Sequence, residues 1–367
     1  MSALLPLLAD LREQRTFAFE EPWRLSSRSL GLAVPIVRKE YGPRGYVLLE
    51  ELPGGVEVRD SGSIRRLIAR SGVEKPVFIR GGLVMKGETQ PRAVRFSVVI
   101  LPGEEKAIEA LCVDEARPIR TMARMAPARD VPARVLKELV KGDQAGVWRE
   151  VRTLQMEVVP RYAKPMGEMI FPRHRARERA RGRAREERRV STRRFRVIGP
   201  EIMHFRLRLR PSITTDLLRI SEALEEARKD IRDVIERFPL LKDQVGVVIL
   251  DAKGVYAMEL FDHPDSWSAI AKNAGRKFAE VLAEQAEFEV FKPDKEGIME
   301  AIRAFLDKLA ACDEEVVFKN RLSQTAVLRG EGVQGEYTVL EGSVIHLMAM
   351  RSEEERPHRP PEEEAPF

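Results

Sequence analysis

Polar side chains with the chemistry of an anion site gather at strand ends in the first third of the chain. Gln90 and Arg92 close a segment punctuated by glycines such as Gly87, and Arg117 follows the next strand candidate. An amide offers both a donor and an acceptor, and guanidinium groups can clamp a phosphate or a carboxylate. Because ligand sites are usually assembled where strands end, this pattern predicts a pocket for an anionic ligand.

Two carboxylates stand beside the same strand end. Asp114 or Glu115 could accept a proton or a hydroxyl hydrogen bond, so either is a candidate acid or base. The alternative is structural, since these side chains could cap turns and Arg117 could pair with one of them. The residues alone leave both interpretations open.

Motifs of the common catalytic machineries are absent. The chain has no Walker loop, no GxGxxG, HExxH or GxSxG pattern and no EF-hand loop. Its five histidines stand singly, without a metal-ligand partner at short spacing: His174, His204, His263, His346 and His358. These residues predict no metal site and no identifiable cofactor, and they leave open whether the protein is an enzyme.

A second chemical feature is the arginine run between residues 173 and 196. This stretch holds twelve Arg and three Glu, so the rest of the chain is mildly acidic although the formal net charge is +5. Seven arginines stand at every second position: Arg173, Arg175, Arg177, Arg179, Arg181, Arg183 and Arg185. Between Arg173 and Arg194 no Leu, Ile or Phe offsets the entropy of ordering, so the pattern predicts an exposed, mobile arm.

We expect such an arm to contact the phosphates of RNA or of a ribosome, because guanidinium groups fork onto phosphate oxygens and release counterions. Without Phe, Tyr or Trp between Arg173 and Arg194, the contact should not depend on base sequence. Two alternatives remain. The run could be a solvated charged loop, or it could be shielded by the acidic segments Glu353–Glu355 and Glu362–Glu364.

Composition favours a globular protein in a reducing compartment. With 367 residues, 43% of them hydrophobic, the chain can bury a large core, and its two cysteines form no CxxC pair. Asp10 and Arg12 interrupt the apolar N-terminus, which predicts a short amphipathic helix rather than a signal peptide. We expect a cytoplasmic protein without a membrane span. Charged residues make up 33% and asparagine occurs only at Asn273 and Asn320, a balance typical of thermophiles.

Hydrophobic periodicity predicts the elements. Strands are expected within a β-rich region over residues 31–115, at 45–49, 55–58, 94–101 and 107–113, with a turn at Pro102-Gly103. One helix should run from about Val131 to Met156. A second should span Ser212–Phe238, with an apolar seam that could pack on the chain's own sheet or form a homodimer.

The last third of the chain predicts a hairpin, two helices and three more strands. The hairpin joins residues 245–250 and 255–261 through Gly254, helices follow Asp262 and Pro293, and strands lie near 324–330, 335–340 and 343–350. The fold class is therefore α+β or mixed α/β, with largely antiparallel sheets and several long helices.

Five segments are expected along the chain. They are an N-terminal helix and lead-in (1–28), a β-rich core with its following helix (29–156), a strand pair carrying the arm (157–210), a helix with the C-terminal α/β part (211–351), and a disordered acidic tail (352–367).

Several short motifs occur in an order that resembles the ADP-ribosylglycohydrolase and rhodanese-phosphatase-associated protein family. They span roughly residues 30 to 350: Gly45-Tyr-Val-Leu-Leu-Glu-Glu-Leu, Gly87-Glu-Thr-Gln-Pro-Arg92, Cys112-Val-Asp-Glu-Ala-Arg117, Gly142-Asp-Gln-Ala-Gly-Val-Trp148, Ser212-Ile-Thr214, Val245-Gly-Val-Val-Ile-Leu with Gly254, Glu259-Leu-Phe-Asp262 and Gly342-Ser-Val-Ile-His-Leu347. The chain departs from the family pattern at Leu83, Asp114, Ala116 and Pro118. The arginine run stands as an insertion beyond that pattern.

The resemblance implies binding or processing of a phosphate-bearing, nucleotide-derived ligand such as ADP-ribose, and it implies no established reaction. It adds Gln144 and Trp148 to the ligand-binding candidates and His346 to the catalytic ones. Each has a structural alternative: Trp148 could anchor its helix, His346 could be a satisfied half-buried side chain, and Cys112 could be an inert strand residue. A non-enzymatic RNA- or ribosome-associated protein is the other functional class that the sequence predicts.

Overall fold

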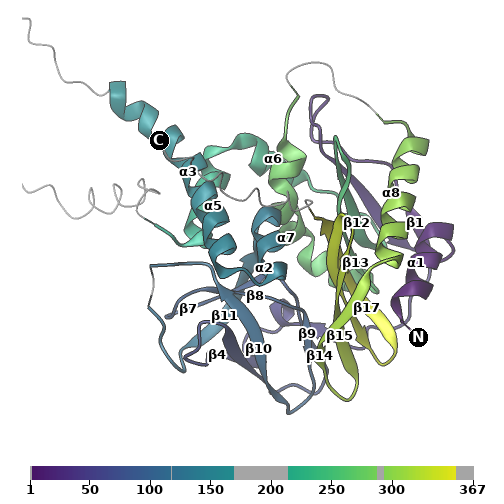
Figure 1. Cartoon of the computed structure of the whole chain (residues 1–367), viewed down its shortest axis with the longest axis horizontal. Coiled ribbons are helices and arrows are strands. Elements are labelled where there is room, and N and C mark those ends of the chain that lie inside the picture. Colours follow the sequence, from purple (N-terminus) through teal and green to yellow (C-terminus); the bar gives the residue numbers. More distant parts are fainter. Residues whose placement is uncertain (1, 117, 169–213, 287–292, 353–367) are drawn as a thin grey trace, which may run out of the picture.

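The computed structural model describes residues 2–116, 118–168, 214–286 and 293–352 (Figure 1). Arg117, the arginine arm, the strands expected beside it and the acidic tail lie outside these residues. The helices are α1 (Leu4–Glu13), the short 3-10 helix η1 (Leu49–Glu51), α2 (Ala133–Lys141), α3 (Gln144–Glu168), α5 (Leu217–Ala227), α6 (Lys229–Arg237), α7 (Pro264–Ala283) and α8 (Lys295–Ala310). No described helix is long and apolar enough to cross a membrane.

Seventeen strands fall into three sheets within the described chain. They are β1 (Phe17–Phe19), β2 (Leu32–Arg38), β3 (Val47–Leu48), β4 (Val56–Asp60), β5 (Arg66–Ser71), β6 (Val77–Ile79), β7 (Leu83–Gly87), β8 (Arg92–Val94), β9 (Val98–Ile100), β10 (Glu105–Cys112), β11 (Arg124–Asp130), β12 (Gln244–Asp251), β13 (Gly254–Phe261), β14 (Asp313–Lys319), β15 (Ser323–Gly330), β16 (Val333–Leu340) and β17 (Ser343–Arg351). Almost every pairing is antiparallel, and β3 with β6 is parallel. The α+β class with largely antiparallel sheets is therefore confirmed.

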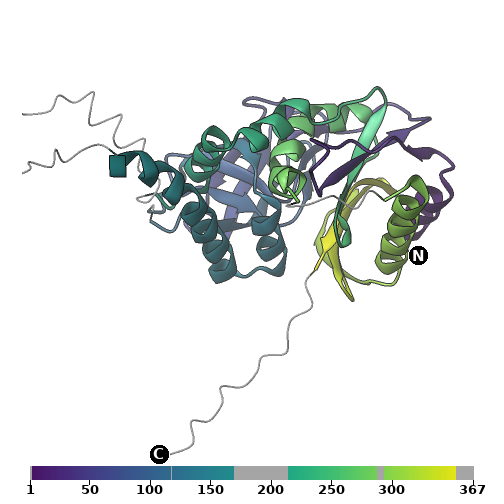
Figure 2. The ribbon, with the colours of Figure 1, turned by 90° about the horizontal axis from the view of Figure 1, so that it is seen from above.

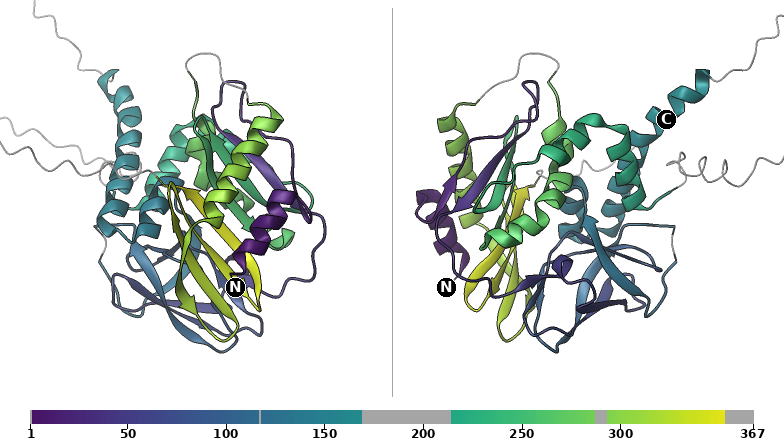
Figure 3. Two further views of the ribbon diagram at one scale, coloured as in Figure 1. Left: turned by 45° about the vertical axis from the view of Figure 1, so that its right-hand side comes forward. Right: turned by 180° about the vertical axis from the view of Figure 1, so that it is seen from behind.

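The large sheet has the strand order β1-β2-β12-β13-β17-β16-β15-β14. Alternation along β13 sends Met258 and Leu260 to one face, where they join a core with α1 and α8. Figure 3 shows α1 and α8 side by side on this face. Glu259 and Phe261 point to the opposite face, which α7 covers together with the barrel.

The second sheet is a closed barrel with the order β10-β5-β4-β11-β7-β8, and its interior is a separate apolar core. The small sheet β3-β6-β9 joins the barrel to the rest of the protein. Along β6, Val77 and Ile79 enter the barrel core whereas Phe78 enters the main core. Figure 2 shows the barrel with its helices on one side and the large sheet with α1 and α8 on the other.

Three expected elements are each broken in two. The helix expected over residues 131–156 is α2 and α3, because Gly142 takes a left-handed φ of 78° and ends α2. The helix expected over 212–238 is α5 and α6, separated by the extended backbone of Arg228. The strand expected over 94–101 is β8 and β9, because the Ser97 N–H donates to the Glu336 carboxylate instead of a strand partner.

Other expectations are confirmed. The N-terminal helix, the β12–β13 hairpin with Gly254 at φ 104°, the two following helices and the last three strands occur where predicted. The seam of α5 and α6 is buried in the main core, through Leu217, Ile220, Leu224 and Val234. This seam therefore packs within the chain. A homodimer through these helices stays a prediction.

Candidate functional site

The residues singled out at the end of β10 do come together, through hydrogen bonds to each other. The Gln90 Nε2 donates to the Asp114 carbonyl oxygen at 2.8 Å, and Gln90 is 4% exposed. The Asp114 carboxylate accepts from the Thr215 hydroxyl at 2.5 Å and from the Ala116 N–H at 3.2 Å. These contacts hold the strand end against the start of α5.

Arg92 is buried beneath them. Its Nη2 donates to the Asp60 carboxylate at 2.8 Å, and its Nη1 donates to the carbonyl oxygens of Ser63 and Arg66. Both side chains of the Arg92–Asp60 pair are 0% exposed. The terminal nitrogens of this guanidinium are thus occupied by the barrel itself, and a ligand would have to displace them.

Gln144, at the start of α3, clamps β10. Its amide accepts from the Cys112 N–H at 3.0 Å and donates to the Cys112 carbonyl at 2.8 Å, as a neighbouring strand would. Burial raises the pKa of the Cys112 thiol to about 11, so it stays protonated. Trp148 lies one helical turn further along α3, half-buried, and its indole acts on the Cys112 thiol, whose pKa it lowers against the effect of burial.

The remaining predicted residues are dispersed. Gly87 lies in β7 so close to β11 that a Cβ atom would be 2.2 Å from the Arg124 carbonyl oxygen. Glu115 is exposed and pairs with Arg152 at 2.7 Å. Arg117 lies outside the described residues. His346 is in β17, on the large sheet, and its Nε2 lies 3.5 Å from Glu259.

A cavity of about 350 Å³ opens at the ends of β13 and β17, next to α1. Two of the sequence motifs meet there, since the segments Leu260–Asp262 and Gly342–Val344 both line it. Pro6 and Leu7 of α1 supply an apolar wall. Arg38, at the end of β2, and Ser343 supply polar groups. The cavity thus has both polar and apolar lining, as small-molecule sites commonly do.

Arg38 is the cation of this cavity. Its Nη1 donates to the Asp262 carbonyl oxygen, and its guanidinium lies 5.4 Å from the centre of the Phe17 ring. The Nε is buried without a hydrogen-bond partner. Within the described residues Arg38 forms no ion pair with a carboxylate. Its charge acts on the nearby Asp262 carboxyl, whose pKa it lowers against the effect of burial, but no ion pair occupies its donors.

Two acidic residues line this cavity, Asp10 and Asp262. The Asp10 carboxylate accepts from the N–H and the hydroxyl of Thr16. Asp262 is the acid next to Arg38. Burial raises its pKa, although the Tyr46 hydroxyl, which donates to it at 2.6 Å, and Arg38 both act in the opposite direction. Tyr46 is itself buried and lies 2.9 Å from the Ser266 hydroxyl. Asp262, Tyr46 and Ser266 thus form a hydrogen-bonded chain that leads from the cavity to the first turn of α7.

Behind the cavity lies a buried charged centre, defined here as Arg80, Asp130, Glu259, Lys277 and His346. Lys277 donates to Glu259 at 2.8 Å and pairs with Asp130 at 2.9 Å, while Arg80 donates to both oxygens of Asp130 at 2.7 and 2.8 Å. All five side chains are no more than 2% exposed. Asp130 belongs to the barrel, Lys277 to α7, and Glu259 and His346 to the large sheet, whereas Arg80 follows β6 of the small sheet. The centre thus joins all four.

The charges of the centre follow from their neighbours. Burial opposes the charge of Lys277, but Asp130 and Glu259 together raise its pKa above the ordinary value. Burial likewise favours a neutral Glu259, but Lys277 and His346 hold the pKa of this carboxyl well below its usual range. Burial lowers the pKa of His346, whose Nε2 is 3.5 Å from Glu259. We therefore assign two cations, two carboxylates and a neutral imidazole.

Glu336 lies beside the centre on the same face of the sheet. It accepts from the Ser97 hydroxyl at 2.5 Å and from the Ser97 N–H at 3.1 Å, which links β16 to the barrel. Burial raises the pKa of this carboxyl to about 7, against the lowering effect of Ser97. Glu336 is thus a proton-holding group at neutral pH, but the cavity beside it measures only about 10 Å³.

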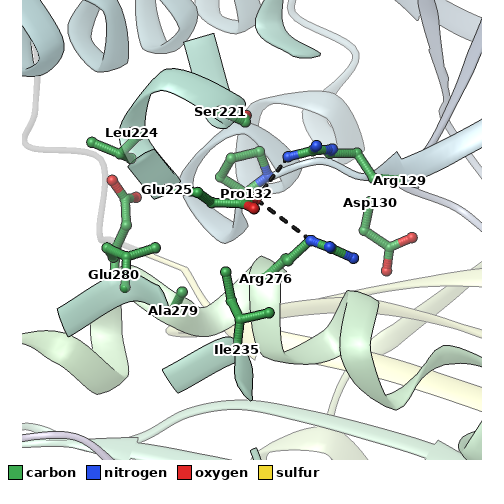
Figure 4. Close-up of a pocket in the computed structure, with 11 residues that line it drawn as sticks. Arg129, Asp130, Pro132, Ser221, Leu224, Glu225, Ile235, Arg276, Ala279 and Glu280 are labelled. Atoms are coloured by element: carbon green, nitrogen blue, oxygen red, sulfur yellow. Dashed lines mark hydrogen bonds and ion pairs between the residues drawn. The ribbon is translucent and has the colours of Figure 1, made fainter. Parts of the chain in front are cut away.

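Two other cavities reach the charged centre. The first, shown in Figure 4, measures about 30 Å³, has Asp130 in its wall and could hold a water molecule or two. In it Arg129 and Arg276 both face Glu225, at 2.7 and 3.5 Å.

The second is a cleft of about 340 Å³ lined by Arg134, Arg228 and Lys277. Each of its cations has a carboxylate partner, for example Arg134 with Glu280 at 3.0 Å and Arg228 with Asp230.

Residues 27–350 match the ARG and Rhodanese-Phosphatase-superfamily-associated Protein domain, ARPP-1. The chain belongs to this family. No curated protein and no solved structure matches it. Arg38, Asp262, Ser343 and the charged centre all lie within the ARPP-1 domain, whereas α1, which walls the cavity, precedes it. No group of three or more potential metal ligands occurs among the described residues of the domain.

Sequence reasoning missed Arg38 and the charged centre. Arg38 ends an apolar strand and carries no motif, so its chemistry is set by which strands lie beside it. Asp262 had a signal, because it closes the motif Glu259-Leu-Phe-Asp262 and precedes a helix, where a carboxylate ordinarily caps. Here His263 is the residue that accepts from the helix, through its Nδ1, and Asp262 is left to face the cavity.

Proposed function

We propose that this protein binds a phosphate-bearing, nucleotide-derived small molecule in the cavity between β13, β17 and α1. The observation that carries the proposal is Arg38, a half-buried guanidinium in a cavity of about 350 Å³ that forms no ion pair with a carboxylate in the described chain. A guanidinium suits a phosphate because its donors match two phosphate oxygens at once. The motif resemblance supports an ADP-ribose-like identity for the rest of the ligand.

The cavity suits this role better than the predicted location at Gln90, Arg92 and Arg117. Arg92 is 0% exposed and already donates to Asp60 and two carbonyl oxygens. Displacing them would leave Asp60 as a buried, unpaired carboxylate, which is costly. The cleft over Lys277 is also less suited, since its cations are paired. We therefore keep the ligand class predicted from the sequence and propose that it binds in this cavity instead of near Gln90 and Arg92.

If the protein acts chemically on the ligand, Asp262 is the residue that would donate or accept the proton. Its pKa is raised by burial, and the negative charge of a bound phosphate would raise it further. A protonated carboxyl can donate to a phosphate oxygen, whereas an ionised one would repel it. Ligand binding should therefore be accompanied by proton uptake, with Tyr46 holding the carboxyl in place.

The test is thermal unfolding with inorganic phosphate, ribose 5-phosphate, AMP, ADP and ADP-ribose. At a concentration of 100 dissociation constants, a ligand of the folded protein adds about 2.7 kcal/mol of stability. We expect a rise in the melting temperature that Arg38→Met abolishes. The control is Arg12→Met, since Arg12 lies on the surface of α1, paired with Asp307, and does not line the cavity.

Two outcomes would contradict the proposal. If none of these compounds stabilises the wild type at millimolar concentration, the protein does not bind this class of ligand and the proposal is wrong. Loss of stabilisation in Gln90→Ala but not in Arg38→Met would return the site to the end of β10.

A second candidate function rests on the arginine run. We propose as the alternative that twelve arginines within residues 173–196 contact RNA phosphates. Deletion of 173–196 should then abolish an RNA affinity that falls steeply with salt. RNA binding that survives the deletion, or that does not depend on salt, would exclude this alternative.

A further inference from the structure

Tyr41 is an exposed aromatic side chain beside the proposed site. Of the large hydrophobic side chains that are exposed in the described chain, it is the one aromatic residue, with 43% of its surface accessible. The other eight are aliphatic or methionine side chains. The ring contacts His263, which follows the cavity-lining Asp262 in sequence, so this exposed aromatic surface lies close to the cavity.

The ring is held in place on two sides. Its hydroxyl donates to Asp243 at 2.8 Å, and its edge contact with the His263 imidazole places the two ring centres 5.0 Å apart with an interplanar angle of 75°. His263 directly follows Asp262, which lines the cavity, and consecutive Cα atoms are about 3.8 Å apart. Tyr41 also follows Arg38 by three residues, so one loop connects the guanidinium to the ring.

We propose that Tyr41 is a stacking platform for the base of the ligand whose phosphate binds Arg38. This inference rests on the proposed function and specifies its ligand class as a compound with a planar aromatic ring. A fixed, solvent-facing ring suits any nucleobase, because stacking depends on the π-face rather than on particular hydrogen bonds. The T-shaped contact with His263 leaves ring surface open, consistent with the 43% exposure.

The structural alternative is that Tyr41 only anchors its loop through Asp243. The two roles use different parts of the side chain. Anchoring needs the hydroxyl, whereas stacking needs the ring, so the substitutions Tyr41→Phe and Tyr41→Leu separate them.

The experiment compares ligand pairs that differ only by the base. Dissociation constants for ribose 5-phosphate and AMP are measured by calorimetry on wild type, Tyr41→Leu, Tyr41→Phe and Arg38→Met. Stacking predicts that the wild type binds AMP at least about fivefold more tightly than ribose 5-phosphate. Tyr41→Leu should remove this preference and leave ribose 5-phosphate binding unchanged, and Tyr41→Phe should retain it. Arg38→Met should weaken both compounds.

The outcomes distinguish the two proposals. If Arg38→Met weakens both compounds but Tyr41→Leu changes neither, the phosphate site stands and the stacking platform is refuted. Equal weakening of both compounds in Tyr41→Leu, or loss of the preference in Tyr41→Phe, would instead give Tyr41 a purely structural role. If the wild type binds neither compound, the proposed function fails and the inference fails with it.

Discussion

Replacing Glu336 by glutamine should change the pH dependence of stability in a direction that its surroundings determine. Glu336 is 3% exposed, and burial raises the pKa of its carboxyl from an ordinary 4.5 to about 7. Such an acid keeps its proton up to a higher pH in the folded chain than in the unfolded chain. The free energy of unfolding therefore falls as pH rises between these two values, and levels off above the higher one.

The size of the effect follows from the same two values. One pKa unit corresponds to about 1.4 kcal/mol, so the step from 4.5 to about 7 is worth about 3 kcal/mol. The Glu336→Gln variant keeps an acceptor oxygen for Ser97 and has no proton to lose. Relative to wild type, its free energy of unfolding should rise by about 3 kcal/mol between pH 4 and pH 8.

Urea unfolding followed by tryptophan fluorescence measures this difference at each pH. Other titrating groups are common to both proteins and cancel in the comparison. The control Glu331→Gln removes an exposed carboxylate from the turn that precedes β16. A difference between Glu336→Gln and wild type that stays constant, or that shrinks as pH rises, would show that Glu336 does not hold a proton in the folded protein.

Two further predictions concern the charged centre and the cavity. Lys277→Met should lower the free energy of unfolding by about 3–5 kcal/mol, because it removes the cation that is hydrogen-bonded to the buried Glu259 and leaves Arg80 alone to balance Asp130 and Glu259. Adding Glu259→Gln should restore part of that loss in urea unfolding, and an additive loss would argue against direct pairing. Asp262→Asn should tighten phosphate binding at pH 8 and flatten its pH dependence, because the amide cannot become an anion beside Arg38. Calorimetry at pH 6 and pH 8 would contradict this if the variant kept the wild-type pH dependence.

The sequence determined much of the local structure. Hydrophobic alternation and turn residues predicted the β12–β13 hairpin, the helices after Asp262 and Pro293 and the last three strands, because each depends on neighbours within a few residues. The same reasoning predicted a single helix or strand at three places where the structure has two shorter ones. At Ser97 the strand breaks because a carboxylate 239 residues away takes the backbone N–H, and no local pattern records such a partner.

The proximity of Gln90 and Asp114 was predicted from the residues, and Gln144 was added by the family resemblance, but the structural role of these side chains was not predicted. Their polarity marked a possible ligand site, whereas the structure shows the same donors and acceptors satisfying one another around the end of β10. Composition reveals which groups are present. Whether a group is free for a ligand depends on which partners the fold places within hydrogen-bond distance.

Only the tertiary structure assembled the charged centre and the cavity. Arg80, Asp130, Glu259, Lys277 and His346 are isolated in the sequence, and each is an ordinary charged or polar residue in its own element. The register of β13 against β17 places Glu259 near His346, and the packing of α7 between barrel and sheet brings Lys277 to both carboxylates. Burial then strengthens the interactions between these charged side chains, because charges that are removed from water interact at a low dielectric constant.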